Sequence, residues 1–179
     1  MHFPIEKECS KMNFFITYGT IEFLQRLKEQ HPKEKLYLLH KEGDQGCLLH
    51  ETTGETIFKE GHNYEALDHV GSIADGKYVV MNNIAVTDEG RPSFESRFNQ
   101  RARLIEKEPG FAAIRVLRPL SNDTYIILTA WEEEKSFTDW QASQAYNQAH
   151  KKRGTSEGVD KQPAIFLRPS YVTSYHIMH

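Results

Sequence analysis

The sequence predicts an α+β fold in which antiparallel sheets carry helices on their outer faces. Two observations support this fold class. Apolar runs of strand length alternate with helical patterns, and the chain from residue 78 onward gives the order β-α-β-β-α-β. That order is the split β-α-β arrangement, which places its strands in one antiparallel sheet with the helices on one face. The earlier residues give a shorter version of the same order, so two halves of similar element order are expected.

The amino-terminal half is predicted to span residues 12–76 and to follow a flexible extension, residues 1–11. Its strands are apolar runs bounded by glycine-containing turns, and its first helix has apolar residues at helical spacing until Pro32 stops the pattern. The expected elements are a strand at 14–18, a helix from 21 to Pro32, strands at 36–39, 47–51 and 55–58, and a short helix at 64–70.

The carboxy-terminal half, residues 77–179, shows the same signals more strongly. Pro92 suits the first turn of a helix, where its missing N–H is not needed, and Pro109-Gly110 is expected to terminate that helix. The expected elements are a strand at 78–86, a helix at 92–108, strands at 111–117 and 124–131, a helix at 133–152 and a strand at 171–177.

The composition argues against several classes of protein. A net charge of −3 at pH 7 leaves no basic surplus to neutralise phosphates, so nucleic acid is not an expected partner. No apolar run approaches the ~20 residues that a membrane helix needs, and residues 1–11 lack the apolar segment of a signal peptide. A cytoplasmic protein without a membrane partner is therefore expected. Cys9 and Cys47 lack partner spacing and are interpreted as reduced thiols.

The sequence also lacks a glycine-rich phosphate loop, a metal-spaced cysteine and histidine cluster, and the nucleophile motif of a hydrolase. Most of its nine histidines are interpreted as solvated or hydrogen-bonded loop residues. These are His31, His40, His50, His62, His69, His176 and His179.

The candidate chemistry lies in residues 131–153, where a tryptophan, a histidine and a basic cluster follow an acidic start. On an unbroken helix, ten residues place Trp140 and His150 ~15 Å apart along the axis and about 80° apart in azimuth. The pair could therefore line one large, flat ligand, particularly if the helix breaks near Ser143, but not one small ligand. From spacing alone, the simpler interpretation is that Trp140 belongs to the core and His150 is exposed at a basic helix end.

Several blocks of this half resemble a known family. A resemblance to the antibiotic-biosynthesis-monooxygenase superfamily is carried by Asn82-Asn83-Ile84-Ala85-Val86-Thr87, by Phe94-Glu95 with Arg97-Phe98, and by Glu108-Pro109-Gly110-Phe111. Within the superfamily, Phe137-Thr138-Asp139-Trp140 and the ten-residue step to His150 are similar to the IsdG-type haem-degrading monooxygenases. The resemblance runs from residue 78 to the end of the chain, and it implies a ferredoxin-like fold of the dimeric α/β-barrel type.

The resemblance implies a role for each residue of this set. His150 would be the axial ligand of the haem iron, because a neutral imidazole can donate a nitrogen lone pair. Asn82, with Asn83 as the alternative, would donate its side-chain N–H to an iron-bound oxygen. Trp140 would press on the porphyrin and buckle it. Haem would be both substrate and cofactor, with O2 and an external electron-donating reductase completing the reaction and iron released.

Basic residues near this set have two interpretations. Arg101, Lys151 and Arg153, together with Lys152, could balance the two haem propionates. The basic run after His150 is equally explained by charge complementarity at a helix carboxy terminus and by solubility.

The amino-terminal half departs from the family. Family members resemble the carboxy-terminal half alone and pair two such domains into a barrel, so the extra half is expected to take the partner's place. We therefore predict a monomer with pseudo-twofold halves, in which residues 12–76 are not catalytic, since both tryptophans lie in the other half. Two alternatives remain open: a monooxygenase of an aromatic substrate that uses no haem, and a non-catalytic haem-binding or signalling protein on the same fold.

Overall fold

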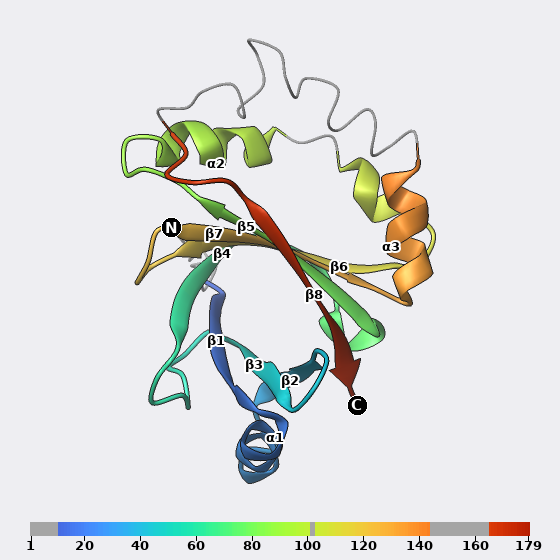
Figure 1. Cartoon of the computed structure of the whole chain (residues 1–179). Helices are drawn as coiled ribbons and strands as arrows, with labels where there is room; N and C mark the ends of the chain where they lie inside the picture. Colours follow the sequence, from blue (N-terminus) through green and yellow to red (C-terminus); the bar gives the residue numbers. More distant parts are fainter. Residues whose placement is uncertain (1–10, 101–102, 144–164) are drawn as a thin grey trace, which may run out of the picture.

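The computed structural model describes residues 11–100, 103–143 and 165–179 of the 179-residue chain. Within them, eight antiparallel strands form a closed barrel in the order β1-β3-β2-β8-β5-β7-β6-β4 (Figure 1). The first half contributes β1 (Asn13–Thr20), α1 (Ile21–Gln30), β2 (Lys35–His40), β3 (Gln45–Thr52) and β4 (His62–Gly71). The second half contributes η1 (Ile73–Asp75), β5 (Tyr78–Ala85), α2 (Arg91–Asn99), η2 (Leu104–Lys107), β6 (Phe111–Pro119), β7 (Thr124–Trp131), α3 (Glu134–Gln141) and β8 (Tyr171–Met178).

Two seams join the halves into one barrel. At the first, β2 pairs with β8 through His40 and His176, and at the second, β4 pairs with β6 from Tyr64 and Pro119 onward. The α+β fold class, with an antiparallel sheet and helices outside it, is confirmed. Strands of both halves close the barrel, so the sheet formed by the described strands has no free edge.

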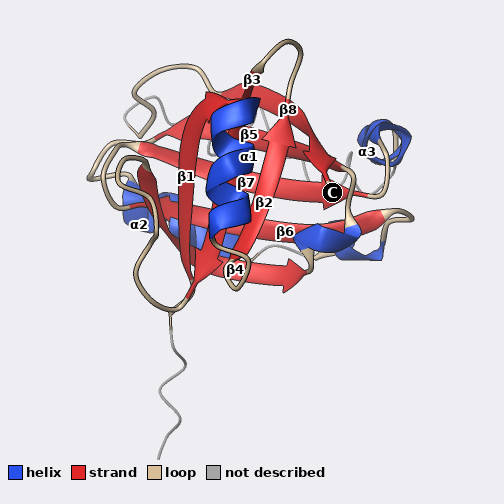
Figure 2. Ribbon diagram, turned by 90° about the horizontal axis from the view of Figure 1, so that it is seen from below, coloured by secondary structure: helices blue, strands red, loops and turns tan. Residues whose placement is uncertain are grey.

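Strand alternation divides the apolar residues between the barrel interior and its outside. The interior cluster takes at least one residue from each strand, for example Ile16 of β1, Met81 of β5 and Tyr175 of β8. Three further clusters lie outside the barrel, one under each of α1, α2 and α3. Figure 2 shows α1 lying across the sheet of the first half, and its amino terminus is capped by Thr20, whose hydroxyl oxygen accepts from the Phe23 N–H.

An ion pair inside the barrel ties the halves together. The Arg115 guanidinium on β6 donates to the Glu51 carboxylate on β3, and both side chains are buried. The same guanidinium donates to the carbonyl oxygens of Val70 and Gly71, each at 3.0 Å, and the Tyr37 hydroxyl donates to Glu51 at 3.2 Å. Because each polar group has partners, the cost of burying the charges is offset.

Two expectations for the first half are wrong. Residues 64–70 are not a helix but belong to β4, because this segment pairs with both β1 and β6 and its pairing closes the barrel. Residues 55–58 form no strand; Phe58 at their end packs instead into the cluster under α1. His50 also departs from its expected loop environment, since it lies on β3 and is fully buried.

The helices of the second half are shorter than predicted. The first ends at Asn99, and after a left-handed Arg103 the chain forms the separate turn η2, so it does not continue to residue 108. The helix expected at 133–152 ends at Gln141, where the Ser143 hydroxyl donates to the Trp140 carbonyl oxygen at 2.6 Å. Residues 144–152 lie outside the described residues.

Both cysteines were expected to be reduced thiols. Cys47 is a free thiol in the barrel interior, where burial raises its pKa to about 12. Cys9 lies outside the described residues.

Candidate functional site

Asn82 lies on the outer face of β5, between two apolar clusters. Tyr78 and Val80 precede it on that face and belong to the cluster under α3, and Ile84 follows it in the cluster under α2. Figure 1 shows α2 and α3 on the same side of the barrel, near opposite ends of the sheet formed by β5, β6 and β7. Asn82 therefore occupies the strip of sheet between the two helices.

The strands on either side of Asn82 extend this strip with apolar side chains. Ile127 on β7 and Val172 on β8 are its direct cross-strand partners, so all three side chains lie on the same face. Val172 is 61% exposed, and Ile127 is only half-buried. We call this strip of Asn82, Ile127, Val172 and Ser174 the outer strip. A largely apolar surface that carries one amide and one hydroxyl suits a large, flat ligand.

Trp140 forms the wall of the outer strip on the α3 side. Its ring lies 5.7 Å from that of Trp131 and 6.0 Å from that of Phe137, measured between centroids. Trp131 is fully buried and donates from its indole nitrogen to the Thr129 hydroxyl at 2.9 Å, which fixes the ring beneath. The half-buried Trp140 is thus a rigid, supported aromatic surface at the end of the helix.

Polar contacts anchor α2 at the other end of the strip. The Arg118 guanidinium on β6 donates twice to the Glu95 carboxylate, each at 2.7 Å, and the Tyr125 hydroxyl donates to the same carboxylate. These hydrogen bonds, that of Arg118 first, lower the pKa of Glu95, and the carboxylate raises the pKa of Tyr125 beyond the effect of burial. Phe94 packs on the Tyr125 ring with centroids 4.7 Å apart, so α2 is held firmly on the sheet.

Asn82 and Asn83, the two sequence candidates for one role, point to opposite faces of the sheet. Asn83 faces the barrel interior, where its Nδ2 donates to Met81 O at 3.2 Å, Tyr171 O at 3.2 Å and Thr173 Oγ1 at 3.3 Å. Asn82 shares its face with the cluster that contains Trp140. The structure therefore brings Asn82 and Trp140 to one side of the sheet and keeps Asn83 away from both.

The other predicted site residues are not described. Arg101, His150, Lys151 and Arg153 lie outside the described residues, and His150 follows the last residue of α3, Gln141, by nine positions. Sequence reasoning missed the outer-strip residues Ile127, Val172 and Ser174. The alternation of β8 carried the signal, because Val172 and Ser174 alternate with the interior residues Tyr171, Thr173 and Tyr175.

No group of three or more histidine, cysteine, aspartate or glutamate side chains among the described residues is placed to hold a metal ion. None of the helices in the same ranges is long and apolar enough to cross a membrane.

Comparisons with known proteins identify the family of this chain. The family described as antibiotic biosynthesis monooxygenase matches residues 77–152. A protein of Listeria monocytogenes named heme-degrading monooxygenase is 30% identical over 129 residues, which cover 72% of this chain and 77% of that protein. The signal transduction protein TRAP of Staphylococcus epidermidis is 23% identical over 146 residues, covering 82% and 87% of the two chains.

A solved structure described as a major regulator of staphylococcal pathogenesis has the same fold. It aligns with a TM-score of 0.79 at 22% identity, over 93% of this chain and 99% of its own. The fold is thus shared across the full length, including the amino-terminal half, and the Listeria relative shows the family. The chain belongs to the antibiotic biosynthesis monooxygenase family.

Proposed function

We propose that the protein is a haem-degrading monooxygenase that binds haem on the outer strip and opens the porphyrin with O2 and electrons from an external donor, releasing iron. The observation that carries the proposal is Asn82, set between the anchored helices α2 and α3 in a strip of apolar side chains. The 30% identical heme-degrading monooxygenase of Listeria supports it.

The described residues fit a haem in three respects. Ile127 and Val172 offer an apolar surface to a macrocycle, the amide of Asn82 offers one hydrogen-bond donor near its centre, and Trp140 offers an aromatic wall. A haem bound on this face would cover Val172, whose side chain is 61% exposed, and burial of that apolar surface would favour binding. The haem would supply the iron at which O2 is reduced.

Asn82 is assigned to hydrogen bonding and not to proton transfer. Its side-chain amide is neutral at every pH at which the protein is folded, so it can donate an N–H to an oxygen ligand without acting as an acid. Strands β7 and β8 pair with β5 on both sides of this residue, so its backbone is fixed. A donor held in place before reaction does not have to be reorganised during it.

Trp140 is assigned to shaping the substrate. A ring supported by Trp131 and Phe137 at 5.7 and 6.0 Å cannot withdraw into the protein when a macrocycle presses against it. Contact with such a ring would bend the macrocycle out of its plane, and the bend would expose one carbon of its rim. Trp140 is therefore assigned to the position at which the porphyrin ring opens, and Asn82 to the hydrogen bond that holds the oxygen.

His150 is assigned as the axial ligand through its neutral imidazole. His150 follows Gln141 by nine positions, and a chain of that length spans at most about 30 Å when extended. Arg101, Lys151 and Arg153 are assigned to the propionates. We further expect that residues 12–76 carry no catalytic group and that the protein is a monomer. We also expect it to lie in the cytoplasm and to receive electrons from a reductase.

The test is a visible-light titration of the apoprotein with haemin, followed by ascorbate in air and a chelator assay for iron. The proposal expects a Soret band that saturates and then bleaches with iron release. Asn82→Ala should bind haemin normally but turn over about 100-fold more slowly, since loss of one preorganised donor has that order of effect. His150→Ala should lose the axial ligand, whereas His31→Ala, at the end of α1 on the opposite side of the barrel, should behave as the wild type (Figure 1).

A second candidate function is signalling without catalysis. It is favoured by the similarity to the staphylococcal signal transduction protein, which extends over 82% of this chain, and by the TM-score of 0.79 to a regulator. The same titration separates the two functions. Saturable haemin binding with no bleaching under any reductant supports a haem-responsive regulator, and no binding at all contradicts both haem assignments.

A further inference from the structure

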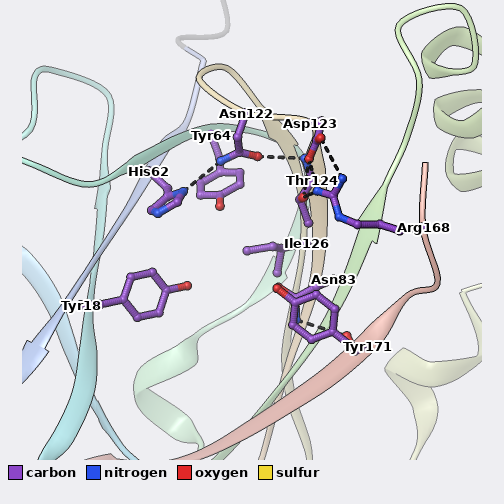
Figure 3. Close-up of a pocket in the computed structure, with 10 residues that line it drawn as sticks. All are labelled: Tyr18, His62, Tyr64, Asn83, Asn122, Asp123, Thr124, Ile126, Arg168 and Tyr171. Atoms are coloured by element: carbon purple, nitrogen blue, oxygen red, sulfur yellow. Dashed lines mark hydrogen bonds and ion pairs between the residues drawn. The ribbon is translucent and has the colours of Figure 1, made fainter. Parts of the chain in front are cut away.

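A cavity opens at one end of the barrel, on the other side of the sheet from the outer strip. It has a volume of about 250 Å³, and we call it the barrel-mouth pocket. Both halves of the chain line it: Tyr18, His62 and Tyr64 come from the first half, and Asn83, Ile126 and Tyr171 from the second (Figure 3). The pocket exists only because the halves close one barrel.

The pocket arises where the interior of the barrel changes from apolar to polar. On β1 the interior residues run Phe14, Ile16, Tyr18, and on β5 they run Val79, Met81, Asn83. Tyr18 and Asn83 thus bring hydrogen-bonding groups to the pocket above an apolar floor. Their convergence favours a ligand with matching groups.

Hydrogen bonds fix which groups the pocket offers. All three hydrogen bonds of the Asn83 Nδ2 go to the protein, so the side-chain oxygen of this pocket-lining residue is the group that can accept from a ligand. The Asn122 oxygen accepts from the Thr124 N–H at 2.8 Å, which turns the Asn122 amide nitrogen towards His62 Nδ1 at 3.0 Å. With the amide nitrogen facing it, His62 Nδ1 is the acceptor of this hydrogen bond.

Two charged side chains at the rim of the pocket pair with each other. Arg168 at its rim is paired with Asp123, with nitrogen–oxygen distances of 2.6 and 3.1 Å. The hydroxyls of Tyr18 and Tyr64 point into the space in Figure 3, and burial raises the pKa of both, so they remain neutral donors. An anion or a cation would therefore find no unpaired opposite charge among these lining residues.

Aromatic rings dominate the mouth. Tyr18 is 50% exposed and Tyr171 is 58% exposed, an unusual exposure for two large rings beside the same opening. Tyr18 packs edge-on against the His62 ring with centroids 5.7 Å apart. A planar ligand ring that entered between Tyr18 and Tyr171 would cover an exposed face of each tyrosine ring. Stacking of this kind is favourable for aromatic pairs.

We propose that the barrel-mouth pocket binds a small, uncharged aromatic molecule with an O–H or N–H group, of the phenol or indole class. The ring lies against Tyr18 and Tyr171, and its O–H or N–H donates to the Asn83 oxygen. A cavity of ~150 Å³ is known to hold benzene, so about 250 Å³ accommodates a substituted single ring. This site is independent of haem, because Asn83 and Asn82 point to opposite faces of the sheet.

The test is a titration of the full-length apoprotein with p-cresol, in which saturation-transfer difference NMR measures binding. A ligand with so few atoms is expected to bind with a Kd on the order of 1 mM. Benzoate, which is charged, and cyclohexanol, which is not aromatic, should bind at least about tenfold more weakly.

Three variants locate the binding site. Tyr18→Ala and Tyr171→Ala, one from each half, should each weaken binding by about fivefold to tenfold. Phe23→Ala removes an equally exposed ring, 57% exposed on α1 and outside the pocket, and should change nothing. Absence of saturable p-cresol binding would overturn the proposal. So would loss of binding in Tyr171→Ala alone, because the ligand would then lie on β8 away from Tyr18, and so would equal binding of benzoate.

Discussion

The outer faces of the two halves differ although their elements follow the same opening order. Over the first half, α1 covers a continuous apolar cluster that includes Leu24, Leu38 and Leu48, each fully buried. Over the second half, α2 and α3 lie apart and leave Asn82 and Val172 between them. One face is therefore a closed core and the other an open surface. For this reason we assign one haem site to a chain with two halves.

The difference has a local cause. In the first half the segment that would correspond to the second helix of the split β-α-β order is β4, a strand that closes the barrel. A single helix then lies centrally on the sheet instead of two helices at its ends. The space is also filled by a buried polar group: His50 pairs with Glu34 at 2.7 Å and with Thr56 at 3.2 Å, between the rings of Phe15 and Phe58. The closed face thus has no room for a flat ligand.

The largest expected effect comes from opening the closed face. Leu24→Ala removes a fully buried side chain from beneath α1 and should lower the free energy of unfolding by about 3–5 kcal/mol. Haemin binding per folded molecule should be unchanged. The cavity left by the substitution lies in the amino-terminal half, whereas the proposed haem site lies on the carboxy-terminal half. Urea unfolding measures the first effect and a Soret titration the second. A weakened Soret response in fully folded variant protein would show that this half takes part in haem binding.

The next effect comes from placing a charge in the open face. Val172→Glu should raise the Kd for haemin roughly 100-fold, because a carboxylate would be buried under the macrocycle without a partner. Stability should hardly change, since Val172 is 61% exposed. The matched control is Met178→Glu, which lies on the same strand and face, ~20 Å away along it. Equal haemin affinities for the two variants would contradict the location of the site.

A smaller effect is expected at the wall of the open face. Trp140→Phe keeps an aromatic ring on Trp131 but shortens the wall, so turnover should fall about tenfold while haemin affinity stays within about threefold. Single-turnover bleaching with ascorbate measures the rate. Phe137→Leu disturbs the same packing without touching the wall itself, and it serves as the control. If both variants lose turnover equally, Trp140 is a packing residue and not a shaping one.

The smallest effect concerns the anchor of α2 and depends on pH. Because the folded-state pKa of Glu95 is lowered below its usual 4.5, its stabilising contribution is fully present above about pH 4.5. The contribution is lost as the pH falls through the folded-state value. Glu95→Gln should therefore cost about 1 kcal/mol at pH 7, and the cost should shrink in acid. Urea unfolding of both proteins at pH 7 and below pH 4 measures this, and a cost that does not depend on pH would contradict the assignment.

Alternation and helical spacing predicted the order of the elements in the second half, because its strands are apolar and its first helix begins beside a proline. They placed the ends of both helices too far along the chain, since α2 ends at Asn99 and α3 at Gln141. The same reasoning misassigned residues 64–70, whose strand character comes from pairing with β1 and β6 and not from their own propensity. Long-range pairing of this kind leaves no local trace in a sequence. The ion pair between Arg115 and Glu51 was missed for the same reason, since 64 positions separate its members.

The candidate site was predictable in part. Asn82 and Trp140 were chosen by resemblance, and strand alternation separates Asn82 from Asn83 once the orientation of β5 is known. The outer-strip residues Ile127 and Val172 could not be chosen from the sequence, because exposure depends on where α2 and α3 come to lie. The barrel-mouth pocket required both halves to be placed against each other. His150, Arg101, Lys151 and Arg153 remain sequence-based assignments.

The central claim is that only one of the two faces takes haem. The number of haem molecules bound per 20.8 kDa chain tests it most directly, by analytical ultracentrifugation observed at the Soret wavelength during a haemin titration. We expect saturation at one haem per chain in a species with the mass of one chain. Saturation at two haem molecules per chain, or binding that requires a species of twice that mass, would contradict it.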